Sequence, residues 1–103
     1  MARVLEQDVI RLVPGISTAK LDKQIDTAFL IVRMALLQAL EKHTTPIRSS
    51  HEGASIIREE FEEAWDKIKA DQHMEACQEI AQLAAMCVRY LVDLELMPRA
   101  DHV

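Results

Sequence analysis

The chain has 103 residues, half of them hydrophobic, and carries a formal net charge of −5 at pH 7. This length suits a single domain, residues 1–103, and the acidic balance argues against binding of nucleic acid through a basic surface. With only two glycines and three prolines, strong helix formers dominate, so the composition predicts an all-α fold.

Two helices are predicted in the first part of the chain. Apolar residues recur at helical spacing as far as Pro14-Gly15, which gives a short N-terminal helix and turn at 3–15. A longer helix is predicted at 19–43. Its middle is apolar nearly all the way round, and such a helix must be covered on more than one side. We therefore expect a homo-oligomer, a dimer or a tetramer, whose interface contains Ile31, Met34 and Leu37.

Two more helices complete the predicted fold. Ser49, with Glu52 three residues later, forms a capping box for a third helix that ends just before Asp71. Asp71 then caps a fourth helix at about 72–96. Short loops favour antiparallel neighbours, so the core helices at 19–96 are predicted to form an antiparallel helical bundle.

Helical periodicity separates two kinds of acidic residue on the third and fourth helices. The predicted buried faces comprise Ala54, Ile57, Phe61, Ala64 and Ile68 on the third helix, and Ala76, Ile80, Leu83, Ala84, Cys87, Val88, Leu91 and Leu94 on the fourth. The acidic residues that should be solvated are Glu59, Glu62 and Asp66. Those that border the buried faces are Glu60 and Glu63 on one helix and Glu75 and Glu79 on the other, with Gln82 on the same edge and Asp93 further along it.

Antiparallel packing would bring these two edges together. Glu63 and Glu79 are equally far from the turn near Asp71, so their carboxylates can lie level on facing helices. Several oxygen ligands around one point suit Mg²⁺, which keeps positions open for water and phosphate. The pattern therefore indicates metal-assisted phosphate chemistry. The plainer alternative is a solvated acidic face, in which Glu63 and Lys67 form an ordinary i,i+4 ion pair.

The remaining polar and aromatic side chains give weaker signals. The four histidines show no metal-ligand spacing, and no phosphate-binding loop or nucleophile motif is present. Cys77 and Cys87 would lie about 15 Å apart along one helix, too far for a disulfide. We expect them to be small buried residues in a reducing, cytosolic compartment, and we expect Trp65 and Tyr90 in the core. No apolar run approaches the ~20 residues of a membrane span, so no membrane partner is expected.

At its acidic residues the chain resembles the MazG-like all-α nucleoside triphosphate pyrophosphohydrolases, in particular small MazG-like proteins of phages and bacteria. That superfamily carries EExxE on one helix and ExxD on the next, and the four acids hold Mg²⁺. The first element corresponds here to Glu59-Glu60-Phe61-Glu62-Glu63 and the second to Glu79-Ile80-Ala81-Gln82. The resemblance covers residues 50–95.

The resemblance implies a hydrolase that uses Mg²⁺, or Mn²⁺ in its place, to convert a nucleoside triphosphate into the monophosphate and pyrophosphate. The residues implied as catalytic are Glu60, Glu63 and Glu79. The same three, together with Gln82, would hold the metal. Lys67, in a row with Glu60 and Glu63, would meet a phosphate oxygen of the nucleotide.

Gln82 departs from the family pattern, which has an aspartate at this place. Its amide oxygen ligates a hard cation more weakly than a carboxylate does, and it cannot act as a base. Either Glu75 supplies the missing charge near the substrate and catalysis is kept, or the protein binds or sequesters nucleotides without turnover. A structural helical oligomer, with a merely solvated acidic face, is the third alternative.

Overall fold

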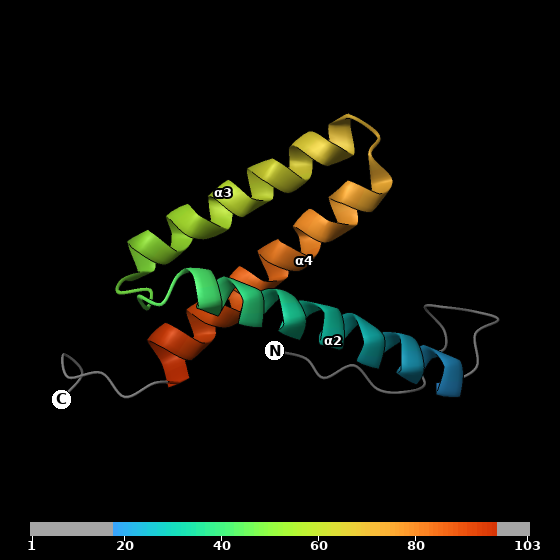
Figure 1. Cartoon of the computed structure of the whole chain (residues 1–103), viewed down its shortest axis with the longest axis horizontal. Coiled ribbons are helices and arrows are strands. Elements are labelled where there is room, and N and C mark those ends of the chain that lie inside the picture. Colours follow the sequence, from blue (N-terminus) through green and yellow to red (C-terminus); the bar gives the residue numbers. More distant parts are fainter. Residues whose placement is uncertain (1–17, 97–103) are drawn as a thin grey trace. The chain divides into compact units, whose positions relative to one another are not determined.

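A computed structural model of the chain describes residues 18–96. Within this range the fold is entirely helical, as the composition predicted, and it contains no strand (Figure 1). The elements are helix α2, Thr18–Lys42, helix α3, Ser50–Lys69, helix α4, His73–Tyr90, and a short π-helix η1, Leu91–Leu96. The three predicted core helices are thus confirmed. The predicted N-terminal helix at 3–15 lies outside the described residues.

Contacts divide the chain into two compact units, Met1–Leu30 and Ile31–Val103, and α2 contributes to both. In the first unit, the described part of α2 carries a local side-chain bond, in which Thr27 Oγ1 donates to the carbonyl oxygen of Lys23 at 2.9 Å. The second unit contains the end of α2 together with α3, α4 and η1. None of the described helices combines the length and the low charge that crossing a membrane would require.

The core of the second unit is small and sits between the end of α2 and the α3–α4 hairpin. Ala35 of α2 meets Ala85 and Met86 of α4, and the residues that pack against this cluster are Val32, Leu36, Ala39, Ile56 and Ile57. Helices α3 and α4 lie side by side and run in opposite directions, joined by a tight turn (Figure 1). The antiparallel pairing of these two helices therefore agrees with the prediction from short loops.

The start of α3 uses the predicted cap in a modified form. Ser49 precedes the helix, and its Oγ accepts a hydrogen bond from the N–H of Glu52 at 3.1 Å. The Glu52 carboxylate accepts from the N–H of Arg48, at 3.3 Å, one residue earlier than a capping box requires. The two bonds together fix the direction in which the chain enters α3.

The turn between α3 and α4 differs from the prediction. Gln72, and not Asp71, precedes α4, and its side chain makes no cap hydrogen bond. Asp71 has a φ of 56°, and the N–H groups of Asp71 and Gln72 donate to the carbonyl oxygens of Ile68 and Lys67. These are the two bonds of a Schellman ending, with aspartate at the left-handed position where glycine is usual. The prediction of Asp71 as an N-cap was wrong because this residue serves to end α3.

The buried side of α3 is rotated from the predicted one. The residues that are buried or half-buried are Gly53, Ile56, Ile57, Glu60, Ala64 and Lys67. Phe61 and Ile68, which were predicted to be buried, are exposed, and so is Trp65. The apolar face of α3 is wider than the strip that one neighbouring helix covers. That strip contains two small buried residues, Gly53 and Ala64, which allow close approach.

The outer side of α4 shows the same difference. Ala76 and Leu94 are buried as predicted, but the apolar side chains of Ile80, Val88 and Leu91 are exposed. Both cysteines are free and exposed, so the prediction of buried thiols was wrong.

Candidate metal centre

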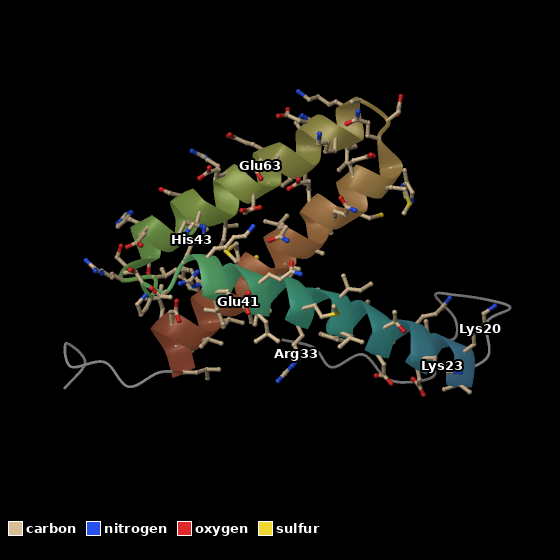
Figure 2. The ribbon with its side chains drawn as sticks, in the orientation of Figure 1. Lys20, Lys23, Arg33, Glu41, His43 and Glu63 are labelled. Atoms are coloured by element: carbon tan, nitrogen blue, oxygen red, sulfur yellow. The ribbon has the colours of Figure 1, made fainter. Side chains whose placement is uncertain are left out.

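Three glutamates from two facing helices converge in the seam of the hairpin. Glu60 and Glu63 lie one turn apart on α3, and Glu79 lies on α4; each offers a carboxylate oxygen, and these oxygens are all within 4.8 Å of one another. We call these three residues the carboxylate cluster. Glu60 and Glu79 are half-buried and Glu63 is exposed, so the cluster lies at the edge of the seam, where solvent reaches it. Figure 2 shows Glu63 midway along α3.

The local sequence explains why these side chains meet. Residues three apart on a helix share a face, which places Glu60 beside Glu63. Glu63 and Glu79 are equally far from Asp71 in the turn, so the tight connection sets them level. Ala64 is 1% exposed and Ala76 is 7% exposed, and these small buried residues flank the cluster. Because a methyl group needs little room, the helices approach closely enough for the longer glutamates to reach one another.

Crowding of like charges raises pKa values in the cluster. Burial raises the pKa of Glu60 above its ordinary 4.5, and the charges on Glu63, Glu79 and Glu59 raise it further. The pKa of Glu63 is also raised, first by desolvation and then by the charges on Glu79 and Glu59. A hydrogen bond with Glu79 adds to this rise, and one with Glu60 opposes it. Each charged neighbour among these causes is another glutamate.

The donor set fits a hard divalent cation. All three ligand atoms are carboxylate oxygens, which suit Mg²⁺ or Mn²⁺ better than the softer metals that prefer imidazole or thiolate. Opposite ligands around Mg²⁺ stand roughly 4.2 Å apart, since each Mg–O bond is about 2.1 Å. The spacing within the cluster is therefore already close to that of a closed site. Three protein ligands leave positions for water or phosphate.

Gln82 is placed beside the cluster without forming part of it. It is half-buried and lies one turn beyond Glu79 on α4. Gln82 and Glu60 are equally far from Asp71, so the two residues are level along the hairpin. This is the register that a fourth ligand from α4 would need, with an amide in place of a carboxylate.

The other two residues predicted to contact substrate lie nearer the turn. Lys67 is half-buried and follows Glu63 by one turn of α3. Glu75 is exposed and precedes Glu79 by one turn of α4. Glu75 does not belong to the cluster of converging carboxylates. The structure thus brings together three of the five predicted acidic residues of the two edges, Glu60, Glu63 and Glu79.

A second charged group, which sequence patterns indicate only weakly, lies at the opposite end of the hairpin. The Nε of Arg89 is 3.3 Å from Oδ2 of Asp93, and both side chains are 6% exposed. Arg89 Nη2 donates to the carbonyl oxygens of His43, at 2.8 Å, and Thr45, at 2.6 Å. Asp93 Oδ2 accepts from the N–H of Ile47 at 2.9 Å. The Arg89–Asp93 pair therefore fixes the α2–α3 loop to the end of α4.

This arrangement corrects the prediction that Asp93 extends the acidic edge of α4. Its carboxylate is committed to Arg89 and to a backbone N–H. The signal in the sequence was an arginine and an aspartate at i,i+4 spacing on a largely apolar helix. Such spacing predicts an ion pair, but burial of that pair depends on the α2–α3 loop, which helical periodicity does not describe.

A cavity of about 540 Å³ lies between the end of α2, the α2–α3 loop and α3. We call it the loop cavity. Its polar walls include Lys42, His43, Thr44, Thr45, Glu59 and Glu60. Glu60 belongs to both the cavity wall and the carboxylate cluster, so the two features adjoin. Figure 2 shows His43 close to the end of α2 where the loop begins.

Comparisons of the chain with models of protein families, with curated proteins and with solved structures found no match. The resemblance to MazG-like enzymes therefore stays a prediction drawn from the two acidic segments.

Proposed function

We propose that the chain binds Mg²⁺ through Glu60, Glu63 and Glu79 and hydrolyses a nucleoside triphosphate to the monophosphate and pyrophosphate. The observation that carries this proposal is the convergence of three carboxylates from two helices. Two of them, Glu60 and Glu63, have raised pKa values, first because of burial and then because neighbouring carboxylates repel their charges. Groups that perturb one another in this way concentrate at functional sites, where the repulsion is kept because a ligand offsets it. The substrate class comes from the resemblance to MazG-like enzymes.

Each residue of the cluster has a role that fits its position. When bound, the metal would neutralise phosphate charge and polarise the bond that is cleaved. Glu60 and Glu79, which are half-buried, would hold the ion. Glu63 is exposed, so its carboxylate can reach solvent as well as the ion, and it would also accept a proton from the attacking water. Lys67, one turn away on α3, would meet a phosphate oxygen.

Gln82 favours a second candidate function, a protein that binds or sequesters nucleotides without turnover. The amide supplies a neutral oxygen at the level of Glu60 and removes one negative charge from the site. Glu75, the carboxylate that would replace this charge, is exposed and outside the cluster. A site with fewer charges repels phosphate less and activates water less well.

Two variants separate these candidates. Gln82→Asp restores a fourth carboxylate and should tighten Mg²⁺ binding and increase turnover if the protein is an enzyme weakened at this position. Glu75→Ala should abolish turnover only if Glu75 supplies the missing charge to the substrate. If wild type turns over and neither variant changes the rate, Gln82 and Glu75 take no part in catalysis.

The proposal as a whole is tested by incubating the purified protein with Mg²⁺ and a panel of nucleoside triphosphates. Products are assayed by chromatography, and binding is assayed separately by calorimetry. Formation of monophosphate and pyrophosphate that is lost in Glu60→Gln and kept in Glu62→Gln supports the enzyme. Binding without products supports the sequestering protein. Neither products nor binding would leave the structural helical oligomer.

We also propose that the chain forms at least a dimer. Ile31, Met34 and Leu37 on α2 are 51%, 53% and 52% exposed. An apolar groove of about 1170 Å³ on the α3–α4 hairpin includes Phe61 and Leu83 among its lining residues. Monomeric proteins seldom expose this much apolar surface without a partner.

Light scattering at micromolar concentration should give at least twice the mass of the chain, and Met34→Lys should reduce the measured mass. A monomeric mass in wild type would contradict the proposal.

A further inference from the structure

The loop cavity combines an apolar floor with a polar rim, which is the composition of a site for a small organic molecule. Ile47 and Met86, which are 3% and 6% exposed, are among its lining residues. The polar residues His43, Thr44 and Thr45, which are exposed, also line it. Its volume of about 540 Å³ lies within the range of known ligand sites, roughly 300–1,000 Å³.

The wall of this cavity is fixed before any ligand binds. The buried Arg89 side chain holds the carbonyl oxygens of His43 and Thr45, and Asp93 holds the N–H of Ile47. Alternate residues of the α2–α3 loop are therefore anchored to α4. A loop held in one conformation loses little entropy when a ligand binds, so the Arg89–Asp93 pair positions the rim for recognition.

The cavity also adjoins the carboxylate cluster through Glu60, which contributes to both. A molecule with phosphate groups at the cluster would thus have its remaining part beside the loop. Glu59 lines the same cavity and is exposed. An ionised carboxylate only accepts hydrogen bonds, so the group that Glu59 contacts must be a donor. On a nucleotide the donors are the sugar hydroxyls and the amino and ring N–H groups of the base.

From this geometry we infer that the loop cavity binds the nucleoside part of the substrate, with Glu59 accepting a hydrogen bond from it. This inference rests on the proposed function, because it needs phosphates at the carboxylate cluster. Glu59 then determines which nucleoside is preferred. It lies next to the carboxylate cluster but does not belong to it. Arg89 acts as a positioning residue through the backbone of the loop.

The experiment compares two ligands that share their phosphates. ATP and inorganic tripolyphosphate are titrated into the full chain by calorimetry in the presence of Mg²⁺. Wild type should bind ATP about tenfold or more tightly than tripolyphosphate, since a hydrogen bond to a charged group and burial of the base each add affinity. Titration of 2′-deoxyATP, 3′-deoxyATP and purine riboside triphosphate, which lacks the amino group, then shows whether a sugar hydroxyl or the amino group supplies the donor.

Two cavity variants and one matched control complete the test. Thr44→Trp fills the cavity and Glu59→Gln removes the acceptor charge, while Glu62→Gln changes another exposed glutamate of α3 that does not line this cavity. Both cavity variants should lose most of the preference for ATP. Glu59→Gln should bind tripolyphosphate as well as wild type or better, because it removes a negative charge beside the cluster. Glu62→Gln should keep the preference.

The outcomes separate failure of this inference from failure of the proposed function. If tripolyphosphate binds with Mg²⁺ but ATP binds no better, or if both cavity variants keep the preference, the inference is wrong and the metal site stands. If neither ligand binds with Mg²⁺, the proposed function fails and the inference falls with it. An ATP preference that is lost only in the cavity variants supports the inference.

Discussion

The α3–α4 hairpin carries two charged groups that differ in kind: one pairs opposite charges, and the other gathers like charges. At one end, Arg89 and Asp93 are buried with opposite charges, and hydrogen bonds through Arg89 Nη2 and Asp93 Oδ2 join the pair to the α2–α3 loop. In the seam nearer the turn, the three glutamates of the carboxylate cluster carry the same charge. Burial and the neighbouring carboxylates raise the pKa values of Glu60 and Glu63. The first group is complete within the chain. The carboxylate cluster needs positive charge from outside, from a cation or from protons, to offset its repulsion. This difference separates a cluster with a structural role from one with a functional role.

The largest loss of stability is expected when the Arg89–Asp93 pair is broken. Arg89→Met should reduce the free energy of unfolding by about 3–5 kcal/mol, because it leaves the Asp93 carboxylate and the two loop carbonyl oxygens buried without their donor. Chemical denaturation measures this loss. Arg58→Met, at an exposed position on α3, is the control and should change stability by less than about 0.5 kcal/mol. Equal losses in the two variants would show that the buried pair has no special role.

A smaller loss is expected from Gly53, which packs beside the same end of the hairpin. A Cβ atom added there would lie 2.7 Å from Cε2 of Tyr90 and closer still to its Cδ2. Alanine in a helix interior normally stabilises by roughly 0.5–1 kcal/mol relative to glycine. Here Gly53→Ala should destabilise by about 1–3 kcal/mol, because the aromatic ring must move.

Whether Gly53→Ala lowers or raises stability is the informative result. Tyr90→Leu removes the ring and its hydrogen bond to Ser50 Oγ, so it lowers stability by itself. In that background Gly53→Ala should no longer be destabilising. Thermal unfolding of the four proteins of this double-mutant cycle gives the coupling directly. A stabilising Gly53→Ala in the wild-type background would contradict the close contact.

The carboxylate cluster should make the metal-free protein more stable as the pH falls from neutral. The folded-state pKa values of Glu60 and Glu63 are raised, so the folded state takes up protons at a higher pH than the unfolded state. Between those raised values and the ordinary 4.5, the folded state binds more protons, and stability therefore increases as the pH decreases. Below about 4.5 both states are protonated and this contribution no longer changes.

Denaturation midpoints of wild type and Glu60→Gln, measured without metal from neutral pH down to 4.5, test this sign. The difference in stability between the two proteins should be largest at neutral pH, with the variant more stable, and should shrink toward acid. A difference that stays constant with pH would contradict repulsion in the cluster.

The sequence predicted the helices and the register of the hairpin well, because both depend on local signals. Helical spacing, the Ser49 cap and the short turn sufficed to place Glu63 level with Glu79. The predicted faces were less accurate, since Phe61 and Trp65 are exposed where periodicity alone assigned them to the core. How much of the apolar face of a helix is covered depends on the neighbouring helices. The sequence of one helix does not specify those neighbours.

The Arg89–Asp93 pair and the loop cavity could not be predicted for a related reason. Both depend on contacts between α4 and a loop more than forty residues earlier, such as the bond from Arg89 Nη2 to the His43 carbonyl oxygen. No periodic pattern marks a loop conformation. The metal, the nucleotide, the oligomer and the cytosolic location stay predictions, because they concern partners and surroundings of the chain.

The central claim is that the carboxylate cluster binds a divalent cation, and thermal unfolding with and without Mg²⁺ tests it most directly. Millimolar Mg²⁺ should raise the Tm of wild type and of Glu62→Gln, because a ligand that binds only the folded state stabilises it by mass action, about 2.7 kcal/mol at a hundred times Kd. Glu60→Gln should have a higher Tm than wild type without metal, since it relieves the repulsion, and should lose the Mg²⁺ response. A wild-type Tm unchanged by Mg²⁺, or an equal response in Glu60→Gln, would contradict the account.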